Sequence, residues 1–166
     1  MMAEKKYRVY IVPGSFDPIT NGHVDVVRRA AEMSEKVFVA VMINDQKKYL
    51  FSLDERTEIA VAACDGLSGV EVRSSSGMLW ELARDLSADA IIKGVRNETD
   101  REYELAMAKY NAEHYPSALT VLLEASEGLS DVSSTLVRGA IERAENLGKH
   151  MPAAAAELAE KIIKNR

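Results

Sequence analysis

Apolar and polar positions alternate in blocks along this chain, and the blocks predict a regular succession of strands and helices. Short apolar runs bounded by polar or turn residues are typical of buried strands, whereas mixed segments with capping signals at their start favour helices. The predicted strands cover residues 7–12, 36–43, 70–73, 90–93 and 118–123. The predicted helices cover residues 22–33, 52–64, 78–86, 100–115 and 133–143, and a last helix begins at residue 152.

Three segments support these assignments on physical grounds. The run 36–43 is almost continuously apolar, as expected for a strand whose two faces are both covered. Ser52 and Glu55 have the spacing of a capping box, and Pro152 suits a first helical turn. Strands that alternate with helices imply right-handed crossovers and a parallel sheet. We therefore expect one Rossmann-like α/β domain over residues 1–166, with a doubly wound parallel five-stranded sheet and helices on both faces.

Composition narrows the classes of partner. The chain has 166 residues, of which 47% are hydrophobic and 28% charged, as in an ordinary globular domain. A net charge of −5 argues against broad binding to nucleic acid or to anionic membranes, so an anionic substrate must meet local basic groups. The apolar run 37–43 is too short to span a bilayer, and no signal-peptide core follows residues 1–6. Cys64 is the only cysteine, which excludes an internal disulfide and favours a cytoplasmic setting.

The most informative segment is Pro13-Gly14-Ser15-Phe16-Asp17-Pro18-Ile19-Thr20-Asn21-Gly22-His23, between the first strand and the first helix. A glycine turn and a helix start place backbone N–H groups and a positive dipole end together, and His23 faces the same place. The segment matches neither the P-loop pattern nor the dinucleotide pattern, so it does not predict a kinase, a GTPase or a dehydrogenase. The alternative is an ordinary strand–turn–helix connection with His23 on the surface. A glycine, a hydroxyl, a turn and a histidine at a helix start all occur in this one segment, and together they favour a site for a reacting phosphate. In doubly wound sheets, ligands bind at this edge.

Basic residues occur at the same predicted edge. Lys93-Gly94-Val95-Arg96 places two cations around a glycine just after a buried strand, which suits a polyphosphate. Lys47 and Lys48 lie in the loop after the second strand. The alternative for residues 93–96 is a solvated turn. The alternative for Lys47 and Lys48 is ordinary surface charge.

Ser133, Ser134 and Thr135 begin a predicted helix after the last strand. Hydroxyls at this position commonly cap the helix, and the same geometry also makes an anion site, so both roles stay open.

The remaining candidates favour ordinary roles. We interpret His114 and His150 as surface residues, Trp80 as packing and Cys64 as inert core. His, Asp and Glu residues show no metal-ligand spacing, so we expect no metal bound by protein side chains.

At the level of motifs, the chain resembles a known family. Residues 14–23 are similar to the signature of bacterial phosphopantetheine adenylyltransferases, with Thr20-Asn21-Gly22-His23 in place of the HxGH of the wider nucleotidyltransferase superfamily. Residues 132–138, Val-Ser-Ser-Thr-Leu-Val-Arg, resemble the second signature ISSTxVR. Residues 47–48, 93–96 and 102–104 fall between the signatures at matching intervals, so the resemblance covers essentially the whole chain.

The resemblance implies a reaction in which ATP and 4′-phosphopantetheine give dephospho-coenzyme A and pyrophosphate, with Mg²⁺ arriving with ATP, in the penultimate step of coenzyme A synthesis. The acceptor phosphate is already an anion, so positioning and charge stabilisation supply the catalysis. It also implies a cytoplasmic homohexamer.

The resemblance further implies roles for individual residues. The catalytic residues are His23, which stabilises the transition state, Lys47 and Lys93. The acceptor contacts are Ser15, Lys47, Leu79 and Lys93. The ATP contacts are Ser15, Phe16, His23, Gly94, Val95, Arg96, Glu104, Leu129, Ser130, Asp131, Val132, Ser133, Ser134 and Thr135.

Two positions depart from the family pattern. Ser15 stands where threonine is frequent, and Lys93 where arginine is common. Lysine lacks the bidentate fork of arginine, so we expect the acceptor to be held more loosely. The rival functions are a related adenylyl- or cytidylyltransferase that uses a nicotinamide or nicotinate mononucleotide or a phosphorylated polyol, and a non-catalytic nucleotide sensor. Retention of His23, both lysines and Arg96 speaks against the sensor.

Overall fold

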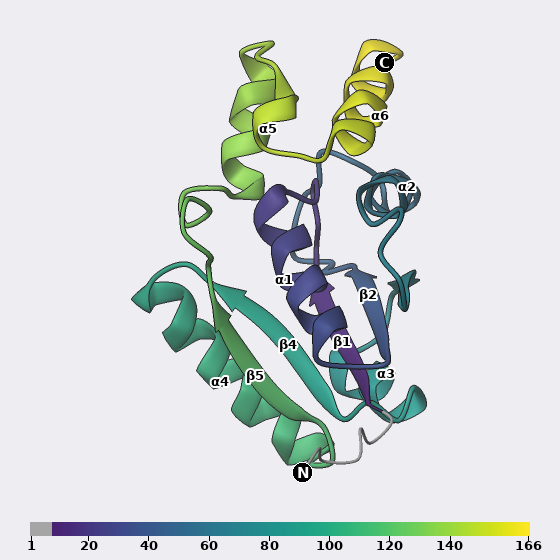
Figure 1. Ribbon diagram of the computed structural model, residues 1–166, viewed down its shortest axis with the longest axis vertical. Coiled ribbons are helices and arrows are strands. Elements are labelled where there is room, and N and C mark those ends of the chain that lie inside the picture. The colour runs from purple at the N-terminus through teal and green to yellow at the C-terminus, as the bar shows by residue number, and fades with distance from the viewer. Residues whose placement is uncertain (1–7) are drawn as a thin grey trace.

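Five parallel strands form one sheet at the centre of the molecule (Figure 1). The computed structural model describes residues 8–166. The strands are β1 (Val9–Gly14), β2 (Lys36–Met42), β3 (Val70–Ser75), β4 (Ala90–Val95) and β5 (Leu119–Glu124). Their order across the sheet is β3-β2-β1-β4-β5, so the chain returns past β1 between β3 and β4. This reversal is the switch point at which doubly wound folds bind ligands.

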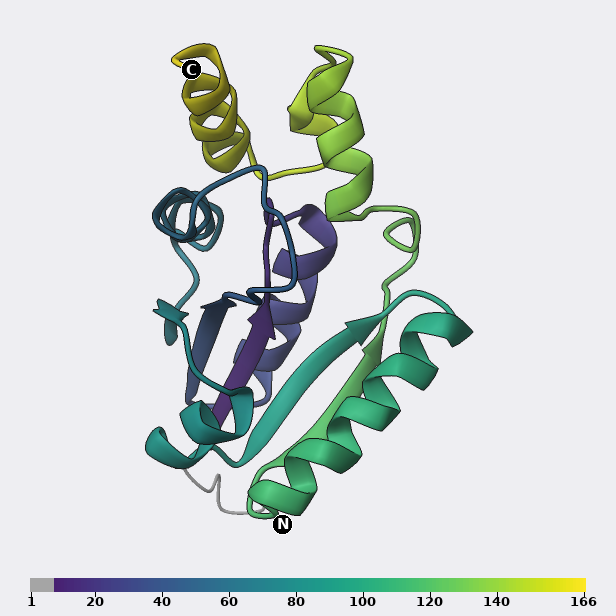
Figure 2. The same cartoon turned by 180° about the vertical axis from the view of Figure 1, so that it is seen from behind.

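Helices cover both faces of the sheet, as the sequence predicts. They are α1 (Asn21–Glu32), α2 (Leu53–Ala63), α3 (Leu79–Asp85), α4 (Glu98–His114), α5 (Ser134–Glu142) and α6 (Ala153–Lys164), with a short 3₁₀ helix, η1 (Leu147–Lys149). The helix α1 crosses one face, and α3 and α4 cross the other, while α5 and α6 stand beyond the carboxyl ends of the strands (Figures 1 and 2). Within residues 8–166, no helix has the length and apolar character that crossing a membrane requires.

Alternate residues of the central strands feed two separate hydrophobic cores. Val39 packs on the face of α1 and α2, with Val27 and Ile59 among its neighbours in that cluster. Ile11 and Ile91 point to the other face and pack with α3. Both faces of β1, of β2 and of the first half of β4 are therefore covered, which explains why these segments are almost continuously apolar in sequence.

The strands β1 and β4 pair over a short stretch only. The strand β1 pairs with β2 from Val9 to Gly14, but with β4 only at Tyr10 and Ile11. Pro13 has no N–H with which to extend a ladder. Beyond Ile11 the two strands are no longer paired, and space for a ligand opens at the switch point.

The observed bounds lie close to the predicted ones. The first strand was expected from Tyr7, which lies outside the described residues. The strand expected over 90–93 continues to Val95, so Gly94 and Val95 lie in the end of β4 rather than after it. Pro152 is the N-cap of α6 instead of a residue of its first turn, and the short helix η1 was not predicted.

Packing on α2 gives a test of the core. Ile59 is completely buried, whereas Val61 on the same helix is 53% exposed. Ile59→Ala should lower the free energy of unfolding by about 2–5 kcal/mol because it leaves a cavity. Val61→Ala should change it by less than about 0.5 kcal/mol. Denaturant titrations of the two variants measure the difference, and equal losses would contradict this packing.

Candidate active site

A pocket of about 370 Å³ lies where β1 and β4 part. Most of the predicted site residues line it, and they come from β4, α1, α4, the start of α5 and the loops that follow β1, β2, β4 and β5. The predicted residues that line the pocket are Ser15, Phe16, His23, Lys47, Lys93, Gly94, Val95, Arg96, Glu104, Leu129, Val132, Ser133, Ser134 and Thr135. Lys48, Leu79, Ser130 and Asp131 are outside this lining, and Ser130 lines a smaller neighbouring pocket. The structure thus brings together segments more than a hundred residues apart in the chain.

Four polar residues of the lining carry no role in the sequence-based assignment. They are Asp17, Thr20, Asp100 and Arg138. Asp17 and Thr20 lie inside the recognised signature, and Arg138 ends the second one. Their roles depend on hydrogen bonds between distant segments, which motif spacing does not reveal.

The turn after β1 depends on a glycine and on a strained phenylalanine. A Cβ on Gly14 would lie 2.9 Å from the ring of Phe16, so only glycine leaves room for that ring. Phe16 has a φ of 48°, in the left-handed region that bulky residues rarely adopt. Its ring is buried and meets the ring of His23 edge-on, with 5.1 Å between centroids. The phenylalanine side chain therefore supports the histidine, and only its main chain is left to meet a ligand.

His23 serves as part of the N-terminal cap of α1. Thr20 is the N-cap residue, and its hydroxyl accepts a hydrogen bond from the N–H of His23. In return, the N–H of Thr20 donates to Nδ1 of His23 over 3.0 Å. This is a capping box with histidine at the position that Glu or Gln usually takes. Because Nδ1 accepts, the neutral ring carries its proton on Nε2, which is free of this cap and can donate to a ligand.

The surroundings of His23 keep the ring neutral. Burial, followed by the nearby charges of Lys93 and Arg96, lowers the pKa of His23 from 6.5 to about 4. The positive charge that protonation would place on the ring would be poorly solvated and repelled by both cations. Near pH 7 the ring is therefore a neutral hydrogen-bond donor rather than an acid.

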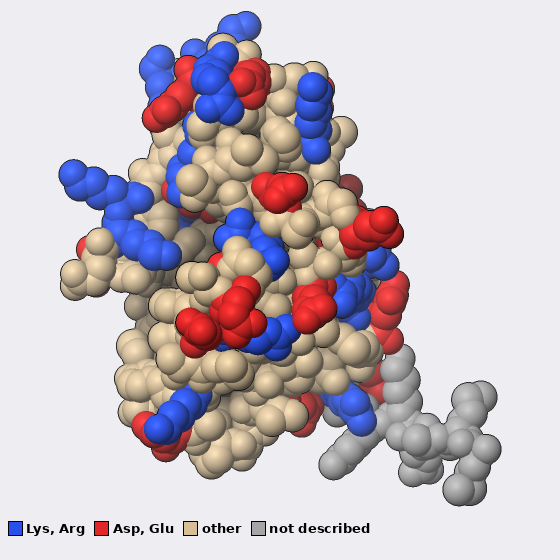
Figure 3. Space-filling view, turned by 90° about the vertical axis from the view of Figure 1, so that its left-hand side faces the viewer, with Lys and Arg blue, Asp and Glu red and all other residues tan. Residues whose placement is uncertain are grey.

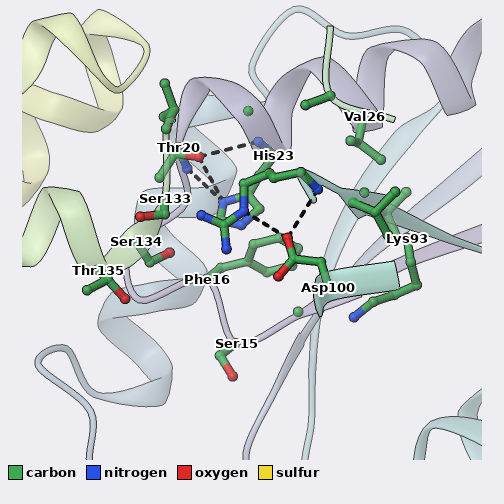
Figure 4. Close-up of a pocket in the computed structure, with 18 of the residues that line it drawn as sticks. Ser15, Phe16, Thr20, His23, Val26, Lys93, Asp100, Ser133, Ser134 and Thr135 are labelled. Carbon is green, nitrogen blue, oxygen red and sulfur yellow. Dashed lines mark hydrogen bonds and ion pairs between the residues drawn. The ribbon is translucent and has the colours of Figure 1, made fainter. Parts of the chain in front are cut away.

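Each of the two pocket cations on or after β4 is paired with a carboxylate of α4. Lys93 Nζ lies 3.3 Å from Glu104 Oε1. Asp100 Oδ2 accepts from both the main-chain N–H and the Nε of Arg96, each over 3.1 Å. Figure 4 shows Lys93 across the pocket from the hydroxyl residues of α5, with His23 and Phe16 between them. A close Gly94–Val26 contact fixes the separation of β4 and α1, since a Cβ on Gly94 would lie 2.8 Å from Val26.

The start of α5 is hydrogen-bonded to the turn after β1. Ser133 caps the helix by accepting from the N–H of Leu136, and Ser134 Oγ donates to the carbonyl of Pro18 over 2.8 Å. Arg138 donates to the carbonyl of Asp17 and to Thr135 Oγ1. The hydroxyls of Ser133 and Ser134 thus already have structural partners, and what this wall of the pocket can offer to an anion is the main-chain N–H groups of a helix start.

Other candidate residues have ordinary surroundings. Cys64 is buried, and burial raises the pKa of its thiol to about 11. His114 is exposed and stacks on Trp80, with 5.0 Å between ring centroids. Within the part of the chain that the structure describes, no group of three or more His, Cys, Asp or Glu side chains is arranged to hold a metal ion.

Comparison with known proteins decides the family. A sequence model described as cytidylyltransferase-like matches residues 11–140. Phosphopantetheine adenylyltransferase of Lactobacillus acidophilus is 40% identical over 158 residues, which are 95% of this chain and 98% of the relative. The enzyme of that name from Caldanaerobacter subterraneus subsp. tengcongensis is 41% identical over 159 residues, covering 95% and 99%. The chain belongs to the phosphopantetheine adenylyltransferase family.

A solved structure extends the likeness to the fold. It is described as a nicotinate-nucleotide adenylyltransferase from Vibrio parahaemolyticus. The TM-score is 0.71 at 16% identity, over 94% of this chain and 93% of the other. The Rossmann-like fold is thus shared between this family and a second group of nucleotidyltransferases.

The lowered pKa of His23 has a consequence for stability. Between about pH 6.5 and pH 4 the unfolded chain binds a proton at this residue that the folded chain does not, so stability falls as the pH falls. His23→Gln keeps a capping-box residue but removes the titrating ring. The wild type should therefore lose more free energy of unfolding than His23→Gln between pH 7 and pH 4. Denaturant titrations across this range measure the loss, and parallel curves would contradict the lowered pKa.

Proposed function

We propose that this chain transfers the adenylyl group of ATP to 4′-phosphopantetheine, releasing pyrophosphate and forming dephospho-coenzyme A. The observation that carries the proposal is the neutral His23, set beside Lys93 and Arg96 in the pocket of a phosphopantetheine adenylyltransferase family member. An oxygen of the acceptor phosphate attacks the α-phosphorus of ATP, and the bond to the bridging oxygen of the β-phosphate breaks. The nucleophile is already ionised, so no protein base is required.

His23 acts as a donor to the α-phosphate oxygens. Its cap with Thr20 orients the ring and leaves the Nε2 proton for the charge that builds in the transition state. Lys47 and Lys93 supply positive charge for catalysis. Together with Ser15 they bind the acceptor phosphate. Leu79 contacts the pantetheine arm.

The nucleotide occupies the half of the pocket between β4 and α5. The residues proposed to bind ATP are Ser15, Phe16, His23, Gly94, Val95, Arg96, Glu104 and residues 129–135. The wall at the start of α5 supports this placement, because its N–H groups and positive dipole end face the pocket.

Magnesium would enter with ATP. The carboxylates near the pocket already have cationic or N–H partners: Glu104 pairs with Lys93, Asp100 with Arg96, and Asp17 with main-chain N–H groups. These carboxylates are therefore engaged within the protein, and a magnesium ion bound with the triphosphate would supply charge neutralisation for the leaving pyrophosphate. A cytoplasmic location agrees with the single, buried, reduced thiol.

A direct assay identifies the acceptor. The protein is incubated with MgATP and, separately, with 4′-phosphopantetheine, a nicotinate or nicotinamide mononucleotide and a phosphorylated polyol, and pyrophosphate is measured. Release is expected with phosphopantetheine. Release with a mononucleotide and none with phosphopantetheine would reject the proposed acceptor, and ATP binding without release from any of them would favour a sensor.

Removing the imidazole tests the proposed chemistry. His23→Ala should lower kcat by about 10²–10³-fold because it deletes one preorganised donor. ATP affinity, measured by calorimetry, should stay near that of the wild type. His114→Ala, which removes an exposed imidazole at the end of α4, is the matched control and should retain full turnover. Unchanged turnover in His23→Ala together with lost ATP binding would refute the role of His23.

We also propose that copies of this chain associate through α4 and β5, as the homohexamer that the family resemblance implies. In the 17-residue helix α4, Asn111 is the one buried residue of those described. Tyr103 of α4 and Leu119 of β5 are 63% and 69% exposed, and Leu105, Met107 and Tyr110 of α4 are exposed as well. Figure 3 shows a broad uncharged area over the lower part of this face, with acids and bases along its margins. Such a surface is typical of contacts between subunits.

A charge on this surface should break the assembly. Leu119→Glu is expected to shift the protein to smaller species in sedimentation velocity, because an unpaired carboxylate would be buried in the contact. Met33→Glu, on an exposed apolar residue after α1, is the control and should keep the assembly of the wild type. An unchanged sedimentation coefficient for Leu119→Glu would place the contact elsewhere.

A further inference from the structure

A buried arginine lies behind the pocket and has no role in the proposed chemistry. Arg56, in the first turn of α2, is 1% exposed. Arginine is almost never fully buried unless its donors are satisfied, because removing the charge from water is costly. The contacts of Arg56 therefore need a structural or functional reason.

The guanidinium of Arg56 joins three separate segments through their main chains. Its Nη1 donates to the carbonyl of Ser15 over 2.7 Å and to that of Met42 over 2.9 Å. Its Nε donates to the carbonyl of Phe51 over 3.2 Å. These acceptors belong to the turn after β1, the end of β2 and the residue before the cap of α2. One side chain thus connects the turn after β1, which contains Ser15, to both ends of the loop 43–52.

A second set of contacts extends from Arg56 to the turn that carries Lys47. The guanidinium lies on the ring of Tyr49, 3.9 Å from the centroid. The hydroxyl of Tyr49 accepts from the N–H of Asn44 over 2.8 Å, and the carbonyl of Asn44 accepts from the N–H of Lys47 over 2.9 Å. Lys47 itself is exposed at the rim of the pocket. Its place therefore depends on this chain of contacts.

Asp17 reinforces the same connection from the other side. Its carboxylate accepts from the N–H groups of Leu50 and Phe51, each over 2.9 Å. Asp17 thus holds the C-terminal end of the loop 43–52, whereas Arg56 also contacts Tyr49 within the loop. The nucleotide half is held by different contacts, since Arg96 is fixed by Asp100 and Ser134 by Pro18.

We infer that Arg56 is a positioning residue for the acceptor phosphate: it fixes Ser15 and the Lys47 loop relative to one another. The inference rests on the proposed function, in which Ser15 and Lys47 bind that phosphate. Loss of the guanidinium should weaken use of the acceptor more than the binding of ATP. Ser15 is one of many proposed ATP contacts, whereas Ser15 and Lys47 are two of the four proposed acceptor contacts.

The decisive variant is Arg56→Lys. Lysine keeps the charge, but one ammonium group cannot reproduce the planar fork or stack on Tyr49. We expect kcat/KM for the acceptor to fall by about 10–100-fold, as for a group displaced by an ångström. The dissociation constant for ATP should remain within about threefold of wild type, because Arg96 and Ser134 are held by contacts that do not involve Arg56. Tyr49→Phe keeps the ring and removes only the hydroxyl, so a smaller effect in the same direction is expected.

A readout independent of turnover accompanies the kinetics. Limited trypsin digestion should cleave after Lys47 and Lys48 faster in Arg56→Lys, because the loop is less firmly held. Ile59→Val, a buried change on the same helix, is the control for lost stability and should leave both the kinetics and the cleavage rate unaltered.

Each outcome supports or overturns the inference. Wild-type acceptor kinetics and wild-type cleavage in folded Arg56→Lys would overturn it, and so would equal losses for ATP and acceptor. If Arg56→Lys does not fold, as judged by circular dichroism, Tyr49→Phe decides by the same criteria. Failure of the proposed function would be seen separately, as a wild type that releases no pyrophosphate with phosphopantetheine.

Discussion

The separation of β1 from β4 is the constraint on which the site depends. The two strands pair at Tyr10 and Ile11 and then part, while β1 stays paired with β2 as far as Gly14. A parallel sheet that changes winding direction here has no crossover helix to cover the gap, so the carboxyl ends stay accessible. The other parts of the site are arranged around the gap between these two strands. The turn after β1 enters it from one side, and the end of β4 supplies a cation from the other.

The capping box of α1 connects helix stability with chemistry. A glutamate at the position of His23 would satisfy the same N–H of Thr20, but it would place a negative charge where a phosphate has to bind. An imidazole satisfies the cap through Nδ1 and leaves a donor on its far nitrogen. The depressed pKa of His23 follows from the same location, because burial and the cations that attract phosphate also disfavour a protonated ring. Neutral histidine is thus the protonation state that suits both the cap and the ligand.

Local signals explain how much the sequence could predict. The capping box of Ser52 and Glu55 and the apolar run of β2 depend on neighbouring residues, and both were correctly predicted. The end of β4 was placed two residues too early, because Gly94 is untypical of a strand although Gly94 and Val95 are both paired with β5. Arg56 gave no signal at all. It looks like any polar residue of a helix start, and its partner Ser15 lies 41 positions earlier in the chain. Contacts of this kind follow from the tertiary fold and not from any motif.

The ion pairs of the pocket bear on which anions can bind. Lys93 and Arg96 are already paired with Glu104 and Asp100, so a phosphate must compete with carboxylates that are held on a rigid helix. A singly charged anion gains little from that exchange, since it replaces one charge–charge contact with another. A triphosphate offers several charges at once and can also use the N–H groups at the start of α5. The pairing therefore favours polyphosphates over small anions, and it does so in a chain whose net charge of −5 repels anions elsewhere. Selectivity for ATP thus begins with the acids of the pocket as much as with its bases.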